Sequence, residues 1–232
     1  MGLEKTRHIH RILVHPRNSQ VIYVGAIGSP WGGHEERGVY RSVDGGKSWK
    51  KILYVNEYTG VADMIMDPGN PNKIFVAMWE HHRQPWFFES GGEGSGLYMT
   101  IDGGDTWTEI TAEDGLPKGT LGRMGLAIAA GNTDVVYALV ESKKNAIYRS
   151  QDGGYTWERR GTENIGDRPF YYADIFVDPD NENRLYSLYS RVNVSEDGGK
   201  NFRMLVGGNI HSDHHAWWIH PQDPSFMIDG ND

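Results

Sequence analysis

The chain has 232 residues, of which 38% are hydrophobic, and this is enough to bury the core of one or at most two domains. Its 30 glycines and 12% aromatic residues favour short strands joined by tight turns over long helices. A net charge of −8 without any Lys or Arg run argues against a nucleic-acid partner, no apolar run reaches the roughly 18 residues that span a bilayer, and the absence of cysteine excludes disulfides and thiolate metal sites.

Four successive stretches of the chain share one order of predicted strands. Each begins with an apolar strand that a turn closes, in residues 9–19, 61–71, 124–133 and 172–182. A second strand follows in 21–26, 73–78, 135–140 and 184–189, and a third in 38–42, 96–100, 146–150 and 192–195. The runs are about five residues long and alternate or are wholly apolar, which is typical of strands.

A close copy of one octapeptide begins at the last residue of each third strand. The copies are SVDGGKSW from Ser42, TIDGGDTW from Thr100, SQDGGYTW from Ser150 and SEDGGKNF from Ser195. Their aspartates recur at intervals of about 45–58 residues, a period that suits the blade of a propeller. We predict a hairpin here, in which the carboxylate accepts backbone N–H groups, the glycines supply unusual backbone angles and the aromatic residue anchors a fourth strand. A structural role is therefore predicted for Asp44, Asp102, Asp152 and Asp197.

One repeat is thus a four-stranded antiparallel meander, and such units bury their faces by stacking. The predicted fold is all-β: one partial β-propeller over residues 1–232, with four complete blades and part of a fifth. The blades are expected at about 8–55, 60–112, 121–161, 170–206 and 213–232. Closed propellers usually have more blades, so we expect the remaining blades or another chain to complete the ring.

The repeated octapeptides resemble the Asp-box (BNR) repeat of sialidases, xyloglucan-type endoglucanases and the sortilin luminal domain. The wider order of segments, among them RGVYRSVDGGKSWKKIL, DPGNPNKIFVAMWE and HSDHHAWWIHPQDP, is similar to secreted bacterial propellers labelled sortilin-like or glycosyl-hydrolase-like. The resemblance covers nearly all of the chain. It implies a propeller fold and an extracellular or periplasmic location, and leaves the reaction open.

In a propeller the first strands line the central channel, so polar residues at their starts are candidates for a ligand site. Asp63 and Asp174 interrupt apolar runs, and they are expected either to pair with Arg11, Arg123 or Arg168 or to serve as tentative catalytic carboxylates together with Asp213. The predicted ligand-binding residues are His10, Arg11, Arg123, Tyr172, His214, His215, His81, His82 and Trp86.

The segment HSDHHAWWIH, from His211, has the densest set of ionisable side chains. No cofactor is required by the predicted fold, but His211, Asp213 and His214 are of the types that bind a divalent metal ion. Strand alternation opposes this, because it points His214 and His215 to opposite faces. It also places one of Trp217 and Trp218 in the core.

Residues 79–96 (WEHHRQPWFFESGGEGSG) form a predicted long loop between the second and third strands of the second repeat. Aromatic rings beside hydrogen-bonding side chains suit sugar recognition, while the alternative is a loop folded over its own blade. The loop SPWGGHEERG of the first repeat, with Trp31 and His34, is its counterpart.

Two functions follow from these patterns. The first is a recognition propeller that holds a glycan, a peptide or a partner domain. The second is a glycoside hydrolase, which needs two carboxylates about 5–9.5 Å apart. Sialidase activity is not expected, because the arginine triad of sialidases is absent. A metal-dependent hydrolase or lyase is the third and least supported alternative.

Overall fold

The structure, a computed structural model, describes residues 2–171, 173–206, 208 and 210–232. The described chain consists of antiparallel strands, with one short 3-10 helix, η1 (Ala112–Asp114). Its contacts divide it into two compact units: Met1–Thr111 with Gly119–Met124, and Ala112–Lys118 with Gly125–Asp232. Within the part described, no helix is long and apolar enough to cross a membrane.

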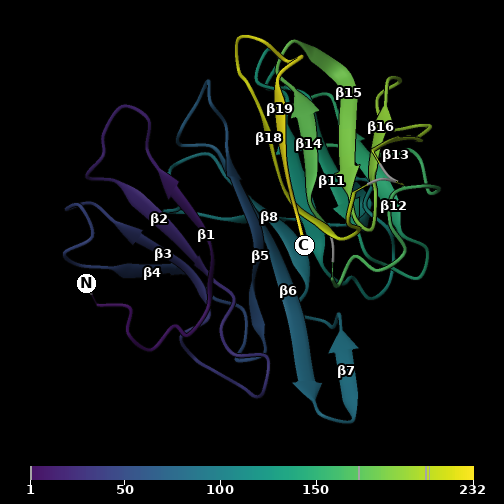
Figure 1. Cartoon of the computed structure of the whole chain (residues 1–232). Helices are drawn as coiled ribbons and strands as arrows, with labels where there is room; N and C mark the ends of the chain where they lie inside the picture. The colour runs from purple at the N-terminus through teal and green to yellow at the C-terminus, as the bar shows by residue number, and fades with distance from the viewer. Residues whose placement is uncertain (1, 172, 207, 209) are drawn as a thin grey trace. The chain divides into compact units, whose positions relative to one another are not determined.

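The first unit holds two sheets whose strands follow chain order, as drawn in Figure 1. The first sheet contains β1 (Ile9–Val14), β2 (Ile22–Ala26), β3 (Gly38–Ser42) and β4 (Lys50–Leu53). The second contains β5 (Thr59–Met66), β6 (Ile74–Gln84), β8 (Gly96–Thr100) and β9 (Thr108–Ile110), with β7 (Phe87–Ser90) paired to the far end of β6.

The second unit repeats this arrangement. One sheet contains β10 (Met124–Ile128), β11 (Val136–Val140), β12 (Ala146–Ser150) and β13 (Glu158–Arg159). The next contains β14 (Ile175–Asp178), β15 (Asn181–Leu188), β16 (Val192–Ser195) and β17 (Arg203–Val206). A two-stranded sheet of β18 (His214–Ile219) and β19 (Met227–Asn231) follows. The predicted β-propeller fold, with four complete blades and part of a fifth, is thereby confirmed. That one propeller domain runs through residues 1–232 stays a prediction.

The Asp-box turns close each complete sheet with side-chain hydrogen bonds. In the first box, Oδ1 of Asp44 accepts the N–H groups of Lys47 and Ser48, both at 2.9 Å, and Oδ2 accepts the Ser48 hydroxyl at 2.6 Å. The other three boxes repeat this pattern around Asp102, Asp152 and Asp197. Both glycines of every box have positive φ, which favours glycine. This geometry supports the structural interpretation of the four aspartates.

Neighbouring sheets within each unit are fastened by the box turns. In the first unit, the Tyr23 hydroxyl donates to the carbonyl of Gly103 at 3.0 Å, and Arg41 donates to that carbonyl at 2.8 Å and to Asp105 at 2.7 Å. In the second unit, Nε of Arg160 donates to the carbonyl of Gly198 in the fourth box at 3.2 Å, and the Tyr137 hydroxyl donates to the Glu182 carbonyl, at the start of β15, at 2.8 Å. We call these contacts the seam hydrogen bonds.

The first strands carry a bulge at a constant place. His10, Ala62 and His215 are each the extra residue between two registered pairs in β1, β5 and β18. A bulge redirects the side chains around it, and bulges are frequent beside functional sites. The polar residues that the sequence placed at the start of these strands therefore lie where the strand geometry changes.

The predicted loop over residues 79–96 is wrong for residues 79–90, which form strands except at the turn of Pro85 and Trp86. β6 continues to Gln84 and returns as β7, so that His81, His82, Arg83 and Gln84 pair with Ser90, Glu89, Phe88 and Phe87. The reason is that residues 81–84 and 87–90 satisfy their backbone N–H and C=O groups by pairing with one another across the turn at Pro85 and Trp86.

Candidate functional site

The β6–β7 hairpin and the loop after β2 form one continuous structure in the first unit. The N–H of Arg83 donates to the carbonyl of Pro30 at 2.7 Å, and Nε2 of Gln84 donates to the carbonyl of Trp31 at 3.3 Å. The guanidinium of Arg83 lies 5.9 Å from the centre of the Trp31 ring. The two aromatic segments that the sequence places about 50 residues apart are therefore joined.

Arg37 holds the loop after β2 in place next to the β6–β7 hairpin. Its side chain is fully buried, and its guanidinium donates to the carbonyls of Ser29, Gly32 and Tyr58, the last at 2.8 Å. Burial lowers the pKa of Arg37 to about 10, which still leaves it charged at neutral pH. A buried cation held by carbonyls fixes the loop backbone, because each of these carbonyls would otherwise lose a hydrogen bond.

A stack of side chains connects Arg37 to β6. His81, which is 4% exposed, lies 3.3 Å from the Arg37 guanidinium through Nδ1. The ring of His81 stacks on that of Trp79, with the two centroids 4.2 Å apart. The guanidinium of Arg123 also lies over the Trp79 ring, 5.7 Å from its centre. Burial and the neighbouring Arg37 charge lower the pKa of His81 to about 4, so this histidine is neutral at physiological pH and packs as a ring.

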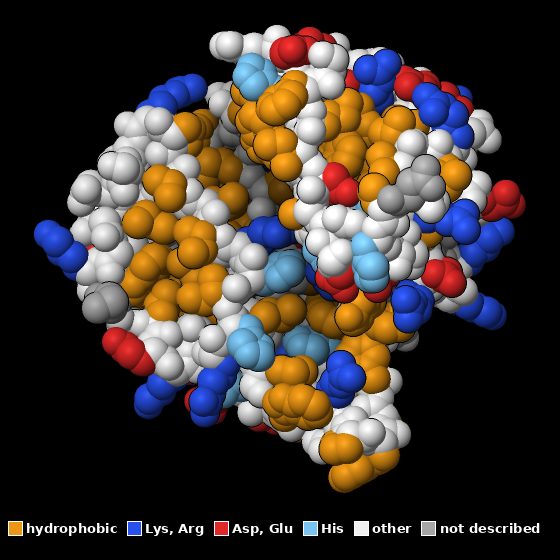
Figure 2. All heavy atoms as spheres, viewed as in Figure 1, with side chains coloured by type: hydrophobic (Ala, Val, Ile, Leu, Met, Phe, Trp, Pro, Cys, Tyr) orange, Lys and Arg blue, Asp and Glu red, His pale blue; other side chains and the backbone are white. Residues whose placement is uncertain are grey.

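Above this base, four aromatic side chains are exposed. We call Trp31, Trp86, Phe87 and Phe88 the aromatic surface; they are 55%, 79%, 40% and 39% exposed. Phe87 and Phe88 are neighbours in β7 and point to opposite faces of the hairpin, Phe87 toward His82 and Phe88 toward Trp79. Figure 2 shows hydrophobic side chains at the tip of the β6–β7 hairpin, at the bottom of the view, with histidine and Lys or Arg side chains beside them. His82 contacts this surface, with its ring centroid 5.2 Å from that of Phe87. Exposed rings on a fixed base, with hydrogen-bonding neighbours, are typical of binding sites.

The predicted pairing of Asp63 with an arginine occurs. Nε of Arg11 lies 2.6 Å from Oδ1 of Asp63, which also accepts the N–H of Met64 at 2.8 Å. The Asp63 side chain is only 6% exposed. A buried carboxylate held in this way stabilises the junction of β1 and β5, and it is already engaged by protein groups.

Of the remaining predicted site residues, His10 lies in the first unit, at the bulge of β1, and the others lie in the second unit. The carbonyl of Asp174 accepts the N–H of Leu188 at 3.0 Å, and Asp213 has a left-handed backbone with φ of 72°. His215 is half-exposed and lies 3.6 Å from a carboxylate oxygen of Asp232. Tyr172 lies outside the described residues. Because Asp63 belongs to the other unit, a pair of catalytic carboxylates stays a prediction.

The predicted metal set His211, Asp213 and His214 is not assembled. Among the described residues, no three His, Asp or Glu side chains lie together so that they could hold a metal ion. His214 is buried, and its Nδ1 donates to both carboxylate oxygens of Asp229, at 2.8 and 2.9 Å. His211 is exposed, and its Nδ1 donates to the Ser212 carbonyl at 2.9 Å. The two histidine rings therefore serve different partners. The expected opposite orientation of Trp217 and Trp218 is confirmed, since Trp217 is buried and Trp218 exposed.

Sequence reasoning missed Arg37, the residue that holds the candidate site together. Its only sequence signal is its place at the end of SPWGGHEERG, a glycine-rich loop whose backbone carbonyls need donors. Ser90 was missed as well, although its hydroxyl accepts the Trp79 indole N–H at 3.0 Å and so fixes that ring.

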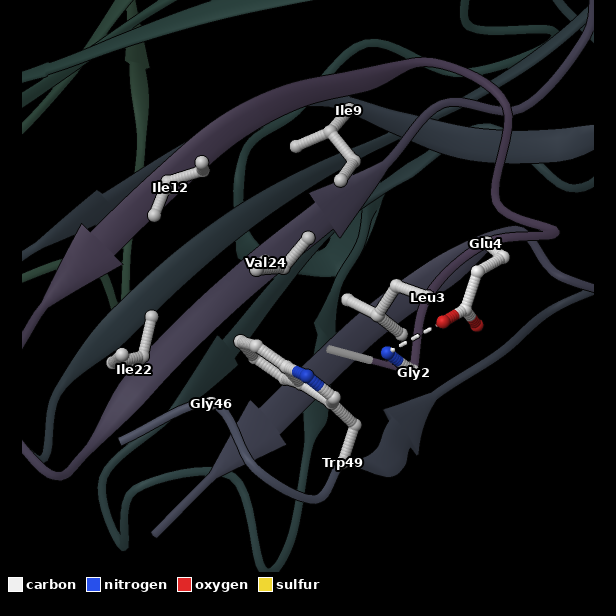
Figure 3. Close-up of a pocket in the computed structure, with 9 residues that line it drawn as sticks. All are labelled: Gly2, Leu3, Glu4, Ile9, Ile12, Ile22, Val24, Gly46 and Trp49. Carbon is white, nitrogen blue, oxygen red and sulfur yellow. Dashed lines mark hydrogen bonds between the residues drawn. The ribbon is translucent and has the colours of Figure 1, made fainter. Parts of the chain in front are cut away.

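A hollow of about 590 Å³ lies on the exposed face of the first sheet. Figure 3 shows Ile9 and Ile12 of β1, Ile22 and Val24 of β2, Leu3 and Trp49 around it. Apart from Glu4, it has no charged side chain to orient a polar ligand. The hollow therefore offers Glu4 as its one charged side chain, and the aromatic surface remains the candidate site.

Comparison with known proteins places the chain among propellers. The curated xyloglucanase Xgh74A from Acetivibrio thermocellus is 22% identical over 91% of this chain, and the chain spans only 26% of that protein's length. A xyloglucanase from a Paenibacillus species is 25% identical over 55% of the chain and 12% of its own length.

Solved structures show the same fold. The GH74 xyloglucanase from Xanthomonas campestris matches 96% of this chain and 35% of its own, with a TM-score of 0.64 and 18% identity. An ancestral GH74 enzyme matches 94% of this chain and 28% of its own, with a TM-score of 0.63 and 19% identity. The profile of the Sortilin-Vps10 family, described as "Sortilin, neurotensin receptor 3", matches residues 37–159, just over half of the chain. The chain therefore belongs to the Sortilin-Vps10 family, as the Asp-box resemblance implied.

Proposed function

We propose that the chain is a glycan-recognition module that binds sugar rings on the aromatic surface. The observation that carries this proposal is the exposure of Trp31 and Trp86 on a hairpin and loop that the buried Arg37 fixes. An exposed ring costs free energy in water, and a pyranose face that stacks on it recovers that cost. Arg83 and Gln84 lie beside the rings and offer donors to sugar hydroxyls.

A β-glucan chain is the first ligand to test, because the relatives with matching sequence are named xyloglucanases. A preformed site favours binding, since little conformational entropy is lost when the ligand arrives. An extracellular or periplasmic location is part of this proposal, and the family assignment supports it.

Hydrolysis is the second candidate function, and the enzymatic names of the relatives favour it. Against it, Asp63 is buried and ion-paired with Arg11, and an engaged carboxylate is a poor acid or nucleophile. Asp174 and Asp213 remain as the carboxylates for this reaction.

The test measures binding and turnover on the same protein. Xyloglucan oligosaccharide is titrated by calorimetry into the intact chain and into Trp31→Ala and Trp86→Ala, and we expect each substitution to weaken binding about 10-fold, or about 1.4 kcal/mol. Tyr155→Ala is the matched control, because Tyr155 is 52% exposed in a box turn of the other unit. Equal affinity for Trp86→Ala and the unchanged chain would exclude the aromatic surface as the site. Release of reducing sugar that disappears in Asp213→Ala would favour the hydrolase.

A further inference from the structure

A second pocket, of about 490 Å³, lies in the second unit and has a chemical character unlike that of the aromatic surface. It is built from the loop between β11 and β12, the segment between β13 and β14, and the turn between β15 and β16. The polar or charged lining residues used in the argument below are Lys144, Asn164, Asp167, Tyr189, Ser190 and Arg191. Its volume suits a ligand of the size of a sugar unit.

The floor of this pocket is held rigidly by buried hydrogen bonds. Asn193, which is 2% exposed, donates from Nδ2 to the carbonyl of Asn164 at 2.7 Å and to the Tyr189 hydroxyl at 2.8 Å. The buried Ser187 hydroxyl donates to the Ile165 carbonyl at 2.9 Å. These bonds fix the pocket segment before any ligand arrives, which is the condition for selective binding.

One backbone angle and one side-chain atom at this floor are unusual. Asn164 has a left-handed φ of 58°, and the buried Oδ1 of Asn193 has no hydrogen-bond donor among the described residues. Strained or unsatisfied groups persist where the surrounding structure maintains them, and they concentrate at functional sites. Asparagine adopts left-handed φ in ordinary turns, so the unsatisfied amide oxygen of Asn193 is the feature of this floor that points to a functional site.

The pocket combines positive charge with hydroxyl-binding groups. Lys144 and Arg191 bring two cations against the single carboxylate of Asp167. Burial raises the pKa of Tyr189, so its hydroxyl stays protonated at neutral pH; it accepts from Asn193 and keeps its own proton for a ligand. Arg191 and Asp167 line the same pocket as this hydroxyl.

We propose that this pocket binds the carboxylated sugar unit of a uronic acid, free or within a glycan. Arg191 and Lys144 bind the carboxylate, because a guanidinium matches it with two parallel hydrogen bonds and the ammonium adds a second charge. Asp167 and Asn164 accept from the ring hydroxyls, and the Tyr189 hydroxyl donates to one of them. The site is independent of the aromatic surface, which belongs to the first unit.

Calorimetry on the intact chain tests the proposal with D-glucuronate, a glucuronate-bearing xylo-oligosaccharide, D-glucose and inorganic phosphate at one ionic strength. We expect saturable binding of glucuronate or of the oligosaccharide, and at least about 10-fold weaker binding of glucose and phosphate. Arg191→Ala and Lys144→Ala each weaken it by about 10-fold, the value of a hydrogen bond to a charged group. Lys143→Ala, an exposed neighbour outside the pocket, changes it less than 2-fold.

Several results would overturn the assignment. Absence of saturable binding for both uronate probes removes the site, and equal binding of phosphate makes it a simple anion site. Equal losses in Lys143→Ala and Lys144→Ala would mean that only general surface charge is involved. Amide chemical shifts of Gly166 and Ser190 give a second readout, and these must move with glucuronate in the unchanged chain but not in Arg191→Ala. Trp86→Ala must leave glucuronate binding unchanged. A failure of the uronate pocket can therefore be told apart from a failure of the glycan site proposed on the aromatic surface.

Discussion

At the scale of single residues, one carboxylate does most of the structural work in each repeat. In the third box, partial burial alone would raise the pKa of Asp152, but bonds from the hydroxyl and N–H of Thr156 and from the Ser150 hydroxyl lower it to about 2. Asp197 in the fourth box has a pKa of about 2 for the same balance of causes, with Asn201 in place of Thr156. The ionised form is thus the one that the fold uses.

The box aspartates make the stability of the chain sensitive to acid. Their folded pKa values lie below the unfolded value of about 3.9, so the stabilisation is complete above about pH 4 and is lost as the pH falls toward about 2. We expect the urea midpoint to be steady from pH 6 to 5 and to fall steeply from pH 4 to 2. Asp152→Asn, which cannot ionise, should show a smaller fall. A midpoint that stays level between pH 4 and 2 would contradict this role.

At the scale of strands and sheets, the seam hydrogen bonds explain why tyrosine and arginine stand in otherwise apolar strands. Tyr23 is 2% exposed, and its hydroxyl is satisfied only because the next box turn presents the Gly103 carbonyl. At the matching positions of the second sheet stand Phe75 and Met99, which carry no such donors. The donors Tyr23 and Arg41 of these seam hydrogen bonds therefore belong to the first sheet and are not repeated in the second.

Tyr23→Phe tests a seam hydrogen bond without changing shape. We expect a loss of about 1 kcal/mol in the free energy of unfolding, because one buried hydrogen bond disappears while Arg41 still satisfies the Gly103 carbonyl. Tyr98→Phe is the control, since the Tyr98 hydroxyl makes no hydrogen bond with the described residues and its removal should be nearly neutral. Equal effects of the two substitutions in urea unfolding would show that the seam bond contributes nothing.

At the scale of the whole molecule, stability depends on how closely neighbouring sheets approach within each unit. In the second unit, a Cβ on Gly125 would lie 1.4 Å from the carbonyl oxygen of Ala173. In the first, a Cβ on Gly60 would lie 2.2 Å from the carbonyl oxygen of Ile27. These contacts involve backbone on both sides, so only displacement of a whole strand could relieve them.

Gly125→Ala should therefore destabilise the chain by about 3 kcal/mol or more, beyond the effect of a typical substitution. Gly131→Ala is the matched control, because its Cβ would find only the Pro179 carbonyl oxygen at 3.4 Å and its φ is not positive. Thermal unfolding of both variants checks this. A Gly125→Ala variant as stable as Gly131→Ala would mean that the two strands can separate at little cost.

The candidate site shows where sequence reasoning reaches its limit. The aromatic residues and the burial of one tryptophan at 217–218 follow from residue types and strand alternation, and the pairing of Asp63 with an arginine was one of two alternatives that the sequence left open. The extension of β6 to Gln84 and the role of Arg37 do not, because both depend on partners supplied by distant segments. The pairing of His214 with Asp229 was not foreseen for a similar reason, since no local pattern announces that partner, and the metal hypothesis stays a prediction.

The sequence alone determined the repeating fold, since each box carries the side-chain hydrogen bonds of its turn within eight consecutive residues. Tertiary structure decided which polar residues are buried, which aromatic rings stay exposed and which loops join. Those outcomes depend on contacts between segments far apart in the sequence, and a short-range sequence pattern does not specify such contacts.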